Sequence, residues 1–206
     1  MQSNSLNRSV TRFTTGNQSV ISSRIIGVLV LIFVEIMFFS ALLSSFFVMK
    51  RGRELWNTAG SIQLPVLATG FNTVVLLSSG LFLFLAGKAL KNSNGKLAGA
   101  HLFRAIALGG FFLAFQSYLG VQMINSGLTI SSSVFAGCFH LLIGIHLMQV
   151  VLGIFFMIKI FPKINSAKFG TDQNADQTLQ DQFNSLQVFW LFIMGIWPVI
   201  YAEVYF

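Results

Sequence analysis

Four long stretches of the chain are almost free of charged residues. Residues 25–49, 55–87, 105–158 and 182–202 contain only one Asp, Glu, Lys or Arg between them, which is Glu35. A charge at the centre of a bilayer costs about 2.5–3.5 kcal/mol, so charged residues mark the ends of membrane spans. A helix needs about 20 apolar residues to cross a hydrocarbon core of about 30 Å. The pattern therefore predicts spanning helices.

The longest stretch, 105–158, has room for two crossings. Residues 125–133 interrupt it with Asn, Gly and Ser, which are typical of a turn. The sequence therefore predicts an all-α polytopic membrane protein, a bundle of five transmembrane helices. The spans are placed near residues 25–49, 64–87, 103–123, 134–161 and 185–206.

Two segments are too polar to lie in a bilayer. Residues 1–23, rich in Ser, Asn, Thr and Gln, form a polar tail before a membrane domain at 24–206. The linker Lys163–Gln182 carries three aspartates, Asp172, Asp176 and Asp181. We expect both segments to be exposed to solvent. No small-residue cleavage pattern follows the first span, so we expect that span to remain as a helix.

Composition and charge agree with a bilayer as the natural solvent. The chain is 54% hydrophobic and 9% charged, whereas an ordinary soluble domain has about 25% charged residues. The net charge of +7 would suggest nucleic acid, but the basic residues sit in short clusters between the spans. With the N-terminus inside, ten of the 13 Lys and Arg fall on the inner side. This predicts a cytoplasmic N-terminus and an external C-terminus, and we expect the membrane to be the bacterial cytoplasmic membrane.

Glu35 is the most informative single residue of the sequence. It lies about 11 residues into the first span, roughly 16 Å deep at about 1.5 Å per residue. Desolvation there favours the neutral, protonated acid. Two interpretations remain open, a proton-relay carboxyl and a neutral acid that hydrogen-bonds a neighbouring helix.

Three histidines raise the possibility of axial haem ligation. His140 and His146 are six residues apart, so they do not share a helix face, and His101 lies at the inner end of its span. We therefore expect interhelical hydrogen bonds and no haem in this chain. A metal site is also not expected, since no carboxylates converge and Cys138 is the one cysteine.

Further polar and small residues lie within the spans. We expect them to pack the bundle, because small residues let helices approach and interhelical polar pairs add about 0.6 kcal/mol each. The polar ones are Asn72, Thr73, Ser78, Ser79, Gln116, Ser117, Gln149 and Gln187, and the glycines are Gly109, Gly110, Gly137, Gly144 and Gly153.

Four short segments occur in an order that can be compared with a known family. Residues 34–39 read Val-Glu-Ile-Met-Phe-Phe, and residues 71–80 read Phe-Asn-Thr-Val-Val-Leu-Leu-Ser-Ser-Gly. Gln116-Ser117 follows in the third span, and Gly-Ile-His opens residues 144–153 in the fourth, which end in Gly. The order resembles the five-helix form of subunit III of the haem-copper terminal oxidases, in which the first motif carries a buried Glu.

The chain also departs from that family pattern. The second histidine of the fourth-span motif falls at Gln149, and a His and an Asp of the last span fall at Asn184 and Gln187. Neutral amides keep hydrogen bonding but cannot titrate. A proton role at these positions is therefore not expected.

The resemblance implies a non-catalytic subunit. Such a subunit has no redox centre, packs against the catalytic subunit I and other oxidase subunits that carry haem and copper, holds phospholipid, and supports proton uptake. The oxidase could use cytochrome c or quinol, or the chain could be the related accessory protein of nitric oxide reductase. Two alternatives come from other classes, a small membrane transporter or channel built around Glu35 and a di-haem b-type membrane cytochrome.

Overall fold

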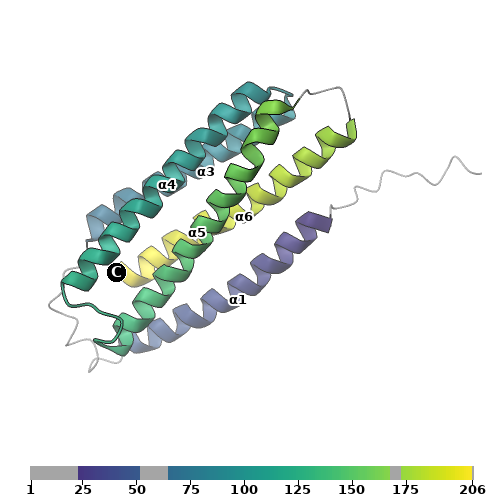
Figure 1. Cartoon of the computed structure of the whole chain (residues 1–206). Helices are drawn as coiled ribbons and strands as arrows, with labels where there is room; N and C mark the ends of the chain where they lie inside the picture. The colour runs from purple at the N-terminus through teal and green to yellow at the C-terminus, as the bar shows by residue number, and fades with distance from the viewer. Residues whose placement is uncertain (1–22, 52–64, 168–172, 206) are drawn as a thin grey trace, which may run out of the picture.

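The computed structural model describes residues 23–51, 65–167 and 173–205. These residues form five long α-helices and no strand, as predicted from the sequence (Figure 1). Each helix is long and apolar enough to cross a membrane. The helices are α1 (Ser23–Arg51), α3 (Val66–Lys91), α4 (Gly95–Asn125), α5 (Val134–Ser166) and α6 (Gln173–Tyr205). The polar tail at 1–22 lies outside the described residues.

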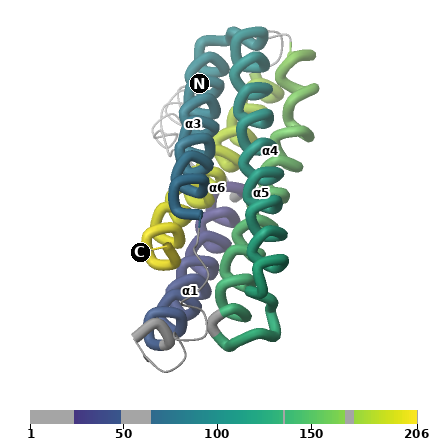
Figure 2. Tube along the Cα trace, turned by 90° about the vertical axis from the view of Figure 1, so that its left-hand side faces the viewer, coloured from purple at the N-terminus to yellow at the C-terminus, as the bar shows by residue number. Residues whose placement is uncertain are grey.

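Four of the helices form a closed unit, and α1 lies beside it. Contacts join α3 to α4, α4 to α5, α5 to α6 and α6 back to α3. Helix α1 packs against α5 and α6 (Figures 1 and 2). Short connections make successive helices antiparallel. The bundle thus has an α3–α4 end, at residues 92–94, and an α4–α5 end, at residues 126–133.

Specific residues stop and start the helices at both ends. Asn94 accepts a hydrogen bond from the Leu97 backbone N–H at 3.1 Å, and Ser133 accepts one from Ala136 at 3.1 Å. Both are N-caps, which satisfy backbone donors that a helix start leaves free. Gly127 has a φ of +97°, a conformation that glycine adopts without strain. The predicted turn at 125–133 is confirmed.

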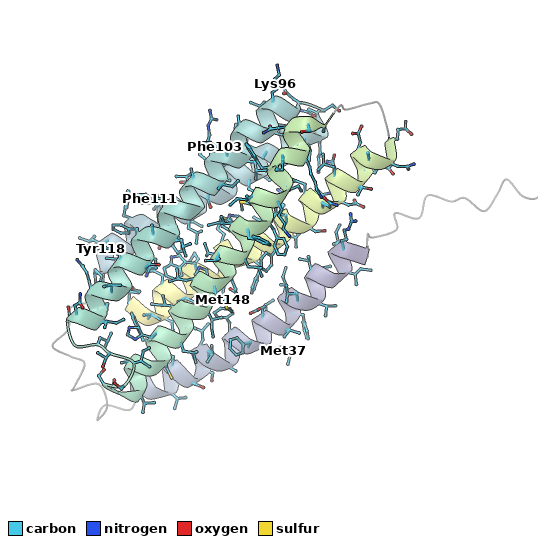
Figure 3. All side chains as sticks on the ribbon, in the orientation of Figure 1. Met37, Lys96, Phe103, Phe111, Tyr118 and Met148 are labelled. Atoms are coloured by element: carbon cyan, nitrogen blue, oxygen red, sulfur yellow. The ribbon has the colours of Figure 1, made fainter. Side chains whose placement is uncertain are left out.

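The bundle keeps large apolar side chains on its outside as well as in its core. Trp190, Trp197 and Phe112 are fully buried. Outward-facing Phe103 and Met148 are 62% and 66% exposed (Figure 3). A water-soluble protein rarely leaves such a continuous apolar surface uncovered. The outer surface therefore fits contact with lipid tails.

Helix α1 is attached through one narrow stripe. Among its described side chains, only Phe39 and Phe46 are fully buried. The buried and half-buried positions recur at alternating spacings of three and four, the period of a helix that uses one seam. They include Ile25, Val28, Ile32, Glu35, Phe39, Leu42 and Phe46.

The helices extend past three of the predicted spans. Helix α4 begins at Gly95, α5 ends at Ser166 and α6 begins at Gln173. The described ends of the predicted linker Lys163–Gln182 are helical, and most of their side chains are exposed as expected, but Ile164 and Leu179 are buried. Polar residues can occupy the outer face of a helix while apolar residues pack inward. Charge and polarity marked the edge of the membrane, but not the ends of the helices.

Candidate functional site

Glu35 meets a partner on a distant helix. The Gln149 side-chain amide on α5 donates a hydrogen bond to Glu35 Oε2 at 2.7 Å. The carboxyl lies on the packed stripe of α1 and is half-buried. Gln149 is 4% exposed. The structure thus joins Glu35 to Gln149. The family pattern that this sequence resembles has a histidine at the position of Gln149.

Aromatic donors on α6 hydrogen-bond to α3 at three levels. Trp190 Nε1 donates to Ser79 Oγ at 3.1 Å, and Trp197 Nε1 donates to Thr73 Oγ1 at 2.9 Å. The Tyr201 hydroxyl donates to the backbone oxygen of Val66 at 3.0 Å. These three donors are spaced by seven and four residues, so they lie on one face of α6.

Ser79 and Thr73 each use both functions of the hydroxyl. The Ser79 hydroxyl donates to the backbone oxygen of Leu76, and that of Thr73 donates to Thr69, both within α3. Each oxygen then accepts an indole N–H from α6. Buried polar groups satisfied in this way cost little, and they fix the register of two helices.

Asn72 joins α3 to α4. Its side-chain N–H group donates to the Phe112 backbone oxygen and to Gln116 Oε1, both at 3.1 Å. Asn72 and Ser79 are seven residues apart, so they lie on one face of α3. In the structure they contact different helices, because that face lies between α4 and α6.

Close approaches centre on Trp190, whose importance the sequence analysis missed. A Cβ added at Gly153 on α5 would lie 2.6 Å from Trp190 ring carbons, and one added at Gly109 on α4 would lie 3.1 Å away. The indole therefore needs both glycines. An added Cβ at Gly110 or Gly144 would meet open space, so no close helix–helix contact requires a glycine at these two positions. The spacing of Trp190, Trp197 and Tyr201 was the signal that could have revealed the donor face.

The three histidines occupy separate environments. His146 is fully buried and stacks on Trp197 at a centroid distance of 4.7 Å. His140 Nδ1 lies 2.8 Å from the Ala136 backbone oxygen in its own helix. His101 stacks on Phe82 near the α3–α4 end. Among the described residues, the His140 ring bonds within its own helix, and the buried His146 ring packs between helices, against Phe112 of α4 and Trp197 of α6.

The two amides of the last span also differ from each other. Gln187 packs its side-chain oxygen against Gly87 of α3, where an added Cβ would lie 2.9 Å away. Asn184 is half-buried on α6. Within the described ranges, no group of three or more His, Cys, Asp or Glu residues could hold a metal ion.

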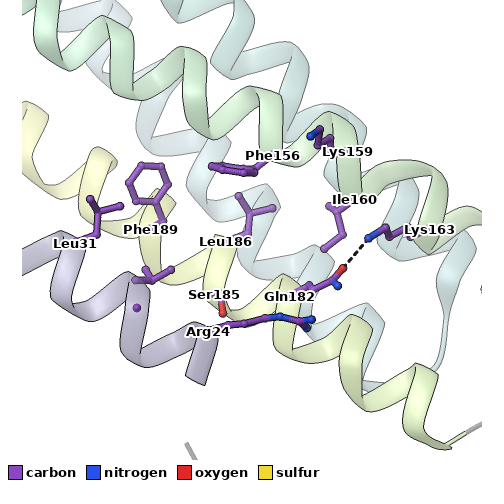
Figure 4. A pocket seen from close by; sticks show the side chains of 12 residues that line it. Arg24, Leu31, Phe156, Lys159, Ile160, Lys163, Gln182, Ser185, Leu186 and Phe189 are labelled. Atoms are coloured by element: carbon purple, nitrogen blue, oxygen red, sulfur yellow. Dashed lines mark hydrogen bonds between the residues drawn. The ribbon is translucent and has the colours of Figure 1, made fainter. Parts of the chain in front are cut away.

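A cavity of about 500 Å³ opens between α1, α5 and α6 toward the α3–α4 end. Arg24, Lys159 and Lys163 lie toward one side of it, and Leu31 and Phe189 lie toward the other (Figure 4). Lys163 donates a hydrogen bond to Gln182 Oε1 at 3.0 Å. The cavity is amphipathic, with cations at one side and apolar walls at the other.

Comparison with known proteins gives one consistent result. The family model described as Cytochrome c oxidase subunit III matches residues 7–206. The chain is 24% identical over 184 residues to cytochrome c oxidase subunit 3 of Synechocystis sp., which covers 88% of this chain and 75% of that protein. It is 28% identical over 185 residues to the Strongylocentrotus purpuratus protein of the same name, covering 87% and 68%. For the Thermostichus vulcanus protein of that name, the identity is 22% over 183 residues, covering 88% and 86%.

Proposed function

Because this chain belongs to the cytochrome c oxidase subunit III family, we propose that it is a non-catalytic subunit packed against the catalytic subunit I of a haem-copper terminal oxidase. The observation that carries the proposal is the family match over residues 7–206, almost the whole chain. The chain is an integral membrane protein with five membrane-length helices. In this proposal, haem and copper belong to the partner subunits, and this chain supports the integrity of the complex.

The side chains of the bundle suit a structural role. Trp190 and Trp197 tie α6 to α3, and Asn72 ties α3 to α4. In this proposal the Glu35 carboxyl accepts the hydrogen bond of the Gln149 amide and holds α1 against the other helices. Any effect of Glu35 on proton uptake is then indirect, through the position of α1.

The distribution of basic side chains supports the proposed orientation. Seven Lys and Arg residues lie toward the α3–α4 end, whereas Lys50 and Arg51 stand in the last turn of α1, at the opposite end; the seven are Arg24, Lys88, Lys91, Lys96, Arg104, Lys159 and Lys163. The positive-inside rule then places this end in the cytoplasm of a bacterial cell. The α4–α5 end and the C-terminus would face the outside.

The amphipathic cavity fits a phospholipid with an anionic headgroup. Arg24, Lys159 and Lys163 would contact the phosphate, while Leu31 and Phe189 would contact an acyl chain. Cations beside a membrane surface attract anionic lipid by about 1 kcal/mol each. A bound lipid would fill the space between α1 and the other helices and strengthen a contact that otherwise depends on one stripe.

Co-purification tests the proposal of an oxidase partner. The full chain, tagged at its N-terminus, is extracted from its native membrane in mild detergent and purified through the tag. We expect a haem-containing catalytic subunit to co-purify in a fixed ratio, together with oxidase activity. Recovery of the folded chain without any haem protein would reject this partner.

A further inference from the structure

Buried polar atoms without a partner are gathered in one part of the bundle. Five such side-chain atoms occur among the described residues, and they lie between mid-depth and the α4–α5 end. Thr69, near the same end, has the Tyr205 hydroxyl as a partner. By contrast, Ser79 and Ser185, at mid-depth and toward the α3–α4 end, are hydrogen-bonded. The five are Asn72 Oδ1, His140 Nε2, both ring nitrogens of His146, and Gln149 Oε1.

These atoms need partners of both kinds. An unsatisfied buried polar group costs about 1–3 kcal/mol, so five of them would cancel much of the stability of a typical domain, which is about 5–15 kcal/mol. A neutral imidazole has one donor and one acceptor nitrogen, whereas the oxygens of Asn72 and Gln149 only accept. Water is the smallest molecule that supplies donors and acceptors together, and buried waters commonly make about three hydrogen bonds to such groups.

Contacts link the residues that carry these atoms into a row, with the Phe112 ring between Asn72 and His146. Asn72 hydrogen-bonds Gln116 and the Phe112 backbone oxygen, and the Phe112 ring contacts His146 at a centroid distance of 6.0 Å. Gln149 lies three residues beyond His146 on the same face of α5. The Gln149 amide then reaches Glu35 on α1. The row therefore runs from α4 to the half-buried Glu35 carboxyl.

A groove gives this row an entrance. It has a volume of about 240 Å³, lies between α4 and α5, and is lined by Gln116, His140 and Tyr205 among other residues. His140 lies two turns from the start of α5, near the α4–α5 end. Gln116 both lines the groove and accepts the hydrogen bond from Asn72. The groove thus adjoins the first member of the row.

We propose that ordered water molecules bind along this row and form a hydrogen-bonded path from the groove at His140, past Asn72 and His146, to the Gln149–Glu35 pair. Through this path the Glu35 carboxyl exchanges its proton with the solvent at the α4–α5 end. The inference concerns this chain alone, so it stands or falls independently of the partner proposed above.

Water-edited solid-state NMR tests the proposal on the unmodified full chain in liposomes. With histidine and tryptophan labelled with 15N, magnetisation transferred from water should reach the His146 ring about as fast as the His101 ring. The indole of Trp190 is the matched control, because it is also fully buried but is hydrogen-bonded to Ser79. A His146 signal that builds up as slowly as that of Trp190 would overturn the proposal. The groove would then be expected to hold a lipid chain.

Infrared spectroscopy tests the end of the path. The carboxyl band that disappears in Glu35→Gln is followed after transfer from H2O to D2O. His146→Phe keeps a ring to stack on Trp197 but removes both nitrogens, so it should slow the shift of this band about tenfold, the factor that 1.4 kcal/mol gives. Ser185→Ala, a buried polar change off the row, should leave the rate unchanged. An unchanged rate in a folded His146→Phe protein would contradict the path.

Discussion

Trp190 donates to Ser79 across the α3–α6 interface, and its ring fills the space that Gly109 and Gly153 leave open. One side chain thus brings four helices together, since Gly109 lies on α4 and Gly153 on α5. In a bilayer, helices gain little from hydrophobic burial against one another and depend on close packing and polar contacts. Trp190 supplies both.

A methyl group at Gly153 should therefore be costly. A Cβ there would lie 2.6 Å from the Trp190 ring, which is held by its hydrogen bond. We expect Gly153→Ala to lower the free energy of unfolding by about 1–3 kcal/mol, as overpacking does in tight cores. Unfolding in mixed micelles measures this. Gly144→Ala, on the same helix but facing open space, is the control and should be neutral or stabilising.

Glu35 should behave as a hydrogen-bonding group. Glu35→Gln preserves the shape and bonding of the neutral acid toward Gln149, so the oxidase complex should assemble with nearly unchanged initial turnover. Glu35→Ala should weaken association of the subunit by about 0.6–2 kcal/mol. Turnover and subunit ratio in the purified complex measure both effects. A tenfold slower initial turnover of a complete Glu35→Gln complex would instead make the carboxyl a working proton carrier.

The cavity at Arg24, Lys159 and Lys163 should retain anionic phospholipid. Native mass spectrometry of the full chain, released from micelles that contain phosphatidylglycerol, should show a bound lipid. The double variant Lys159→Ala, Lys163→Ala should bind about tenfold less, the effect of losing about 1.4 kcal/mol. Lys96→Ala removes an exposed charge at the same end of the bundle, away from the cavity. Equal losses in the two proteins would show that the lipid is held by general charge and not in this cavity.

The proposed orientation predicts which end reacts with an impermeant reagent. In a chain whose Cys138 has been replaced by Ala, Thr129→Cys lies in the α4–α5 turn and Lys96→Cys lies at the α3–α4 end. Intact cells should be labelled at position 129 and not at position 96, whereas broken membranes should be labelled at both. The opposite pattern on intact cells would reverse the orientation.

The sequence was most informative where a single type of residue determines the local structure. The rarity of charge predicted five spans, and Asn, Gly and Ser predicted the turn at 125–133, because both signals are local. Glu35 stood out because placing a carboxyl in the middle of a span is unfavourable in free energy. Its depth alone suggested a partner on another helix.

Pairings between helices could not be predicted in the same way. Nothing local to Glu35 indicates Gln149, 114 positions away, or that Gly153 faces Trp190 while Gly144 faces open space. Such contacts depend on how each helix is rotated about its axis. The uniformly apolar spans give little signal for this, since a face toward lipid and a face toward protein have similar side chains.

An oxidase complex purified from cells that lack this chain would show whether the chain is a non-catalytic subunit. The haem spectrum, the initial turnover and its decay during sustained turnover are compared with those of the intact complex. We expect an unchanged haem spectrum and an initial rate close to that of the intact complex, followed by faster inactivation. Loss of haem or of all initial activity from an otherwise complete complex would contradict it.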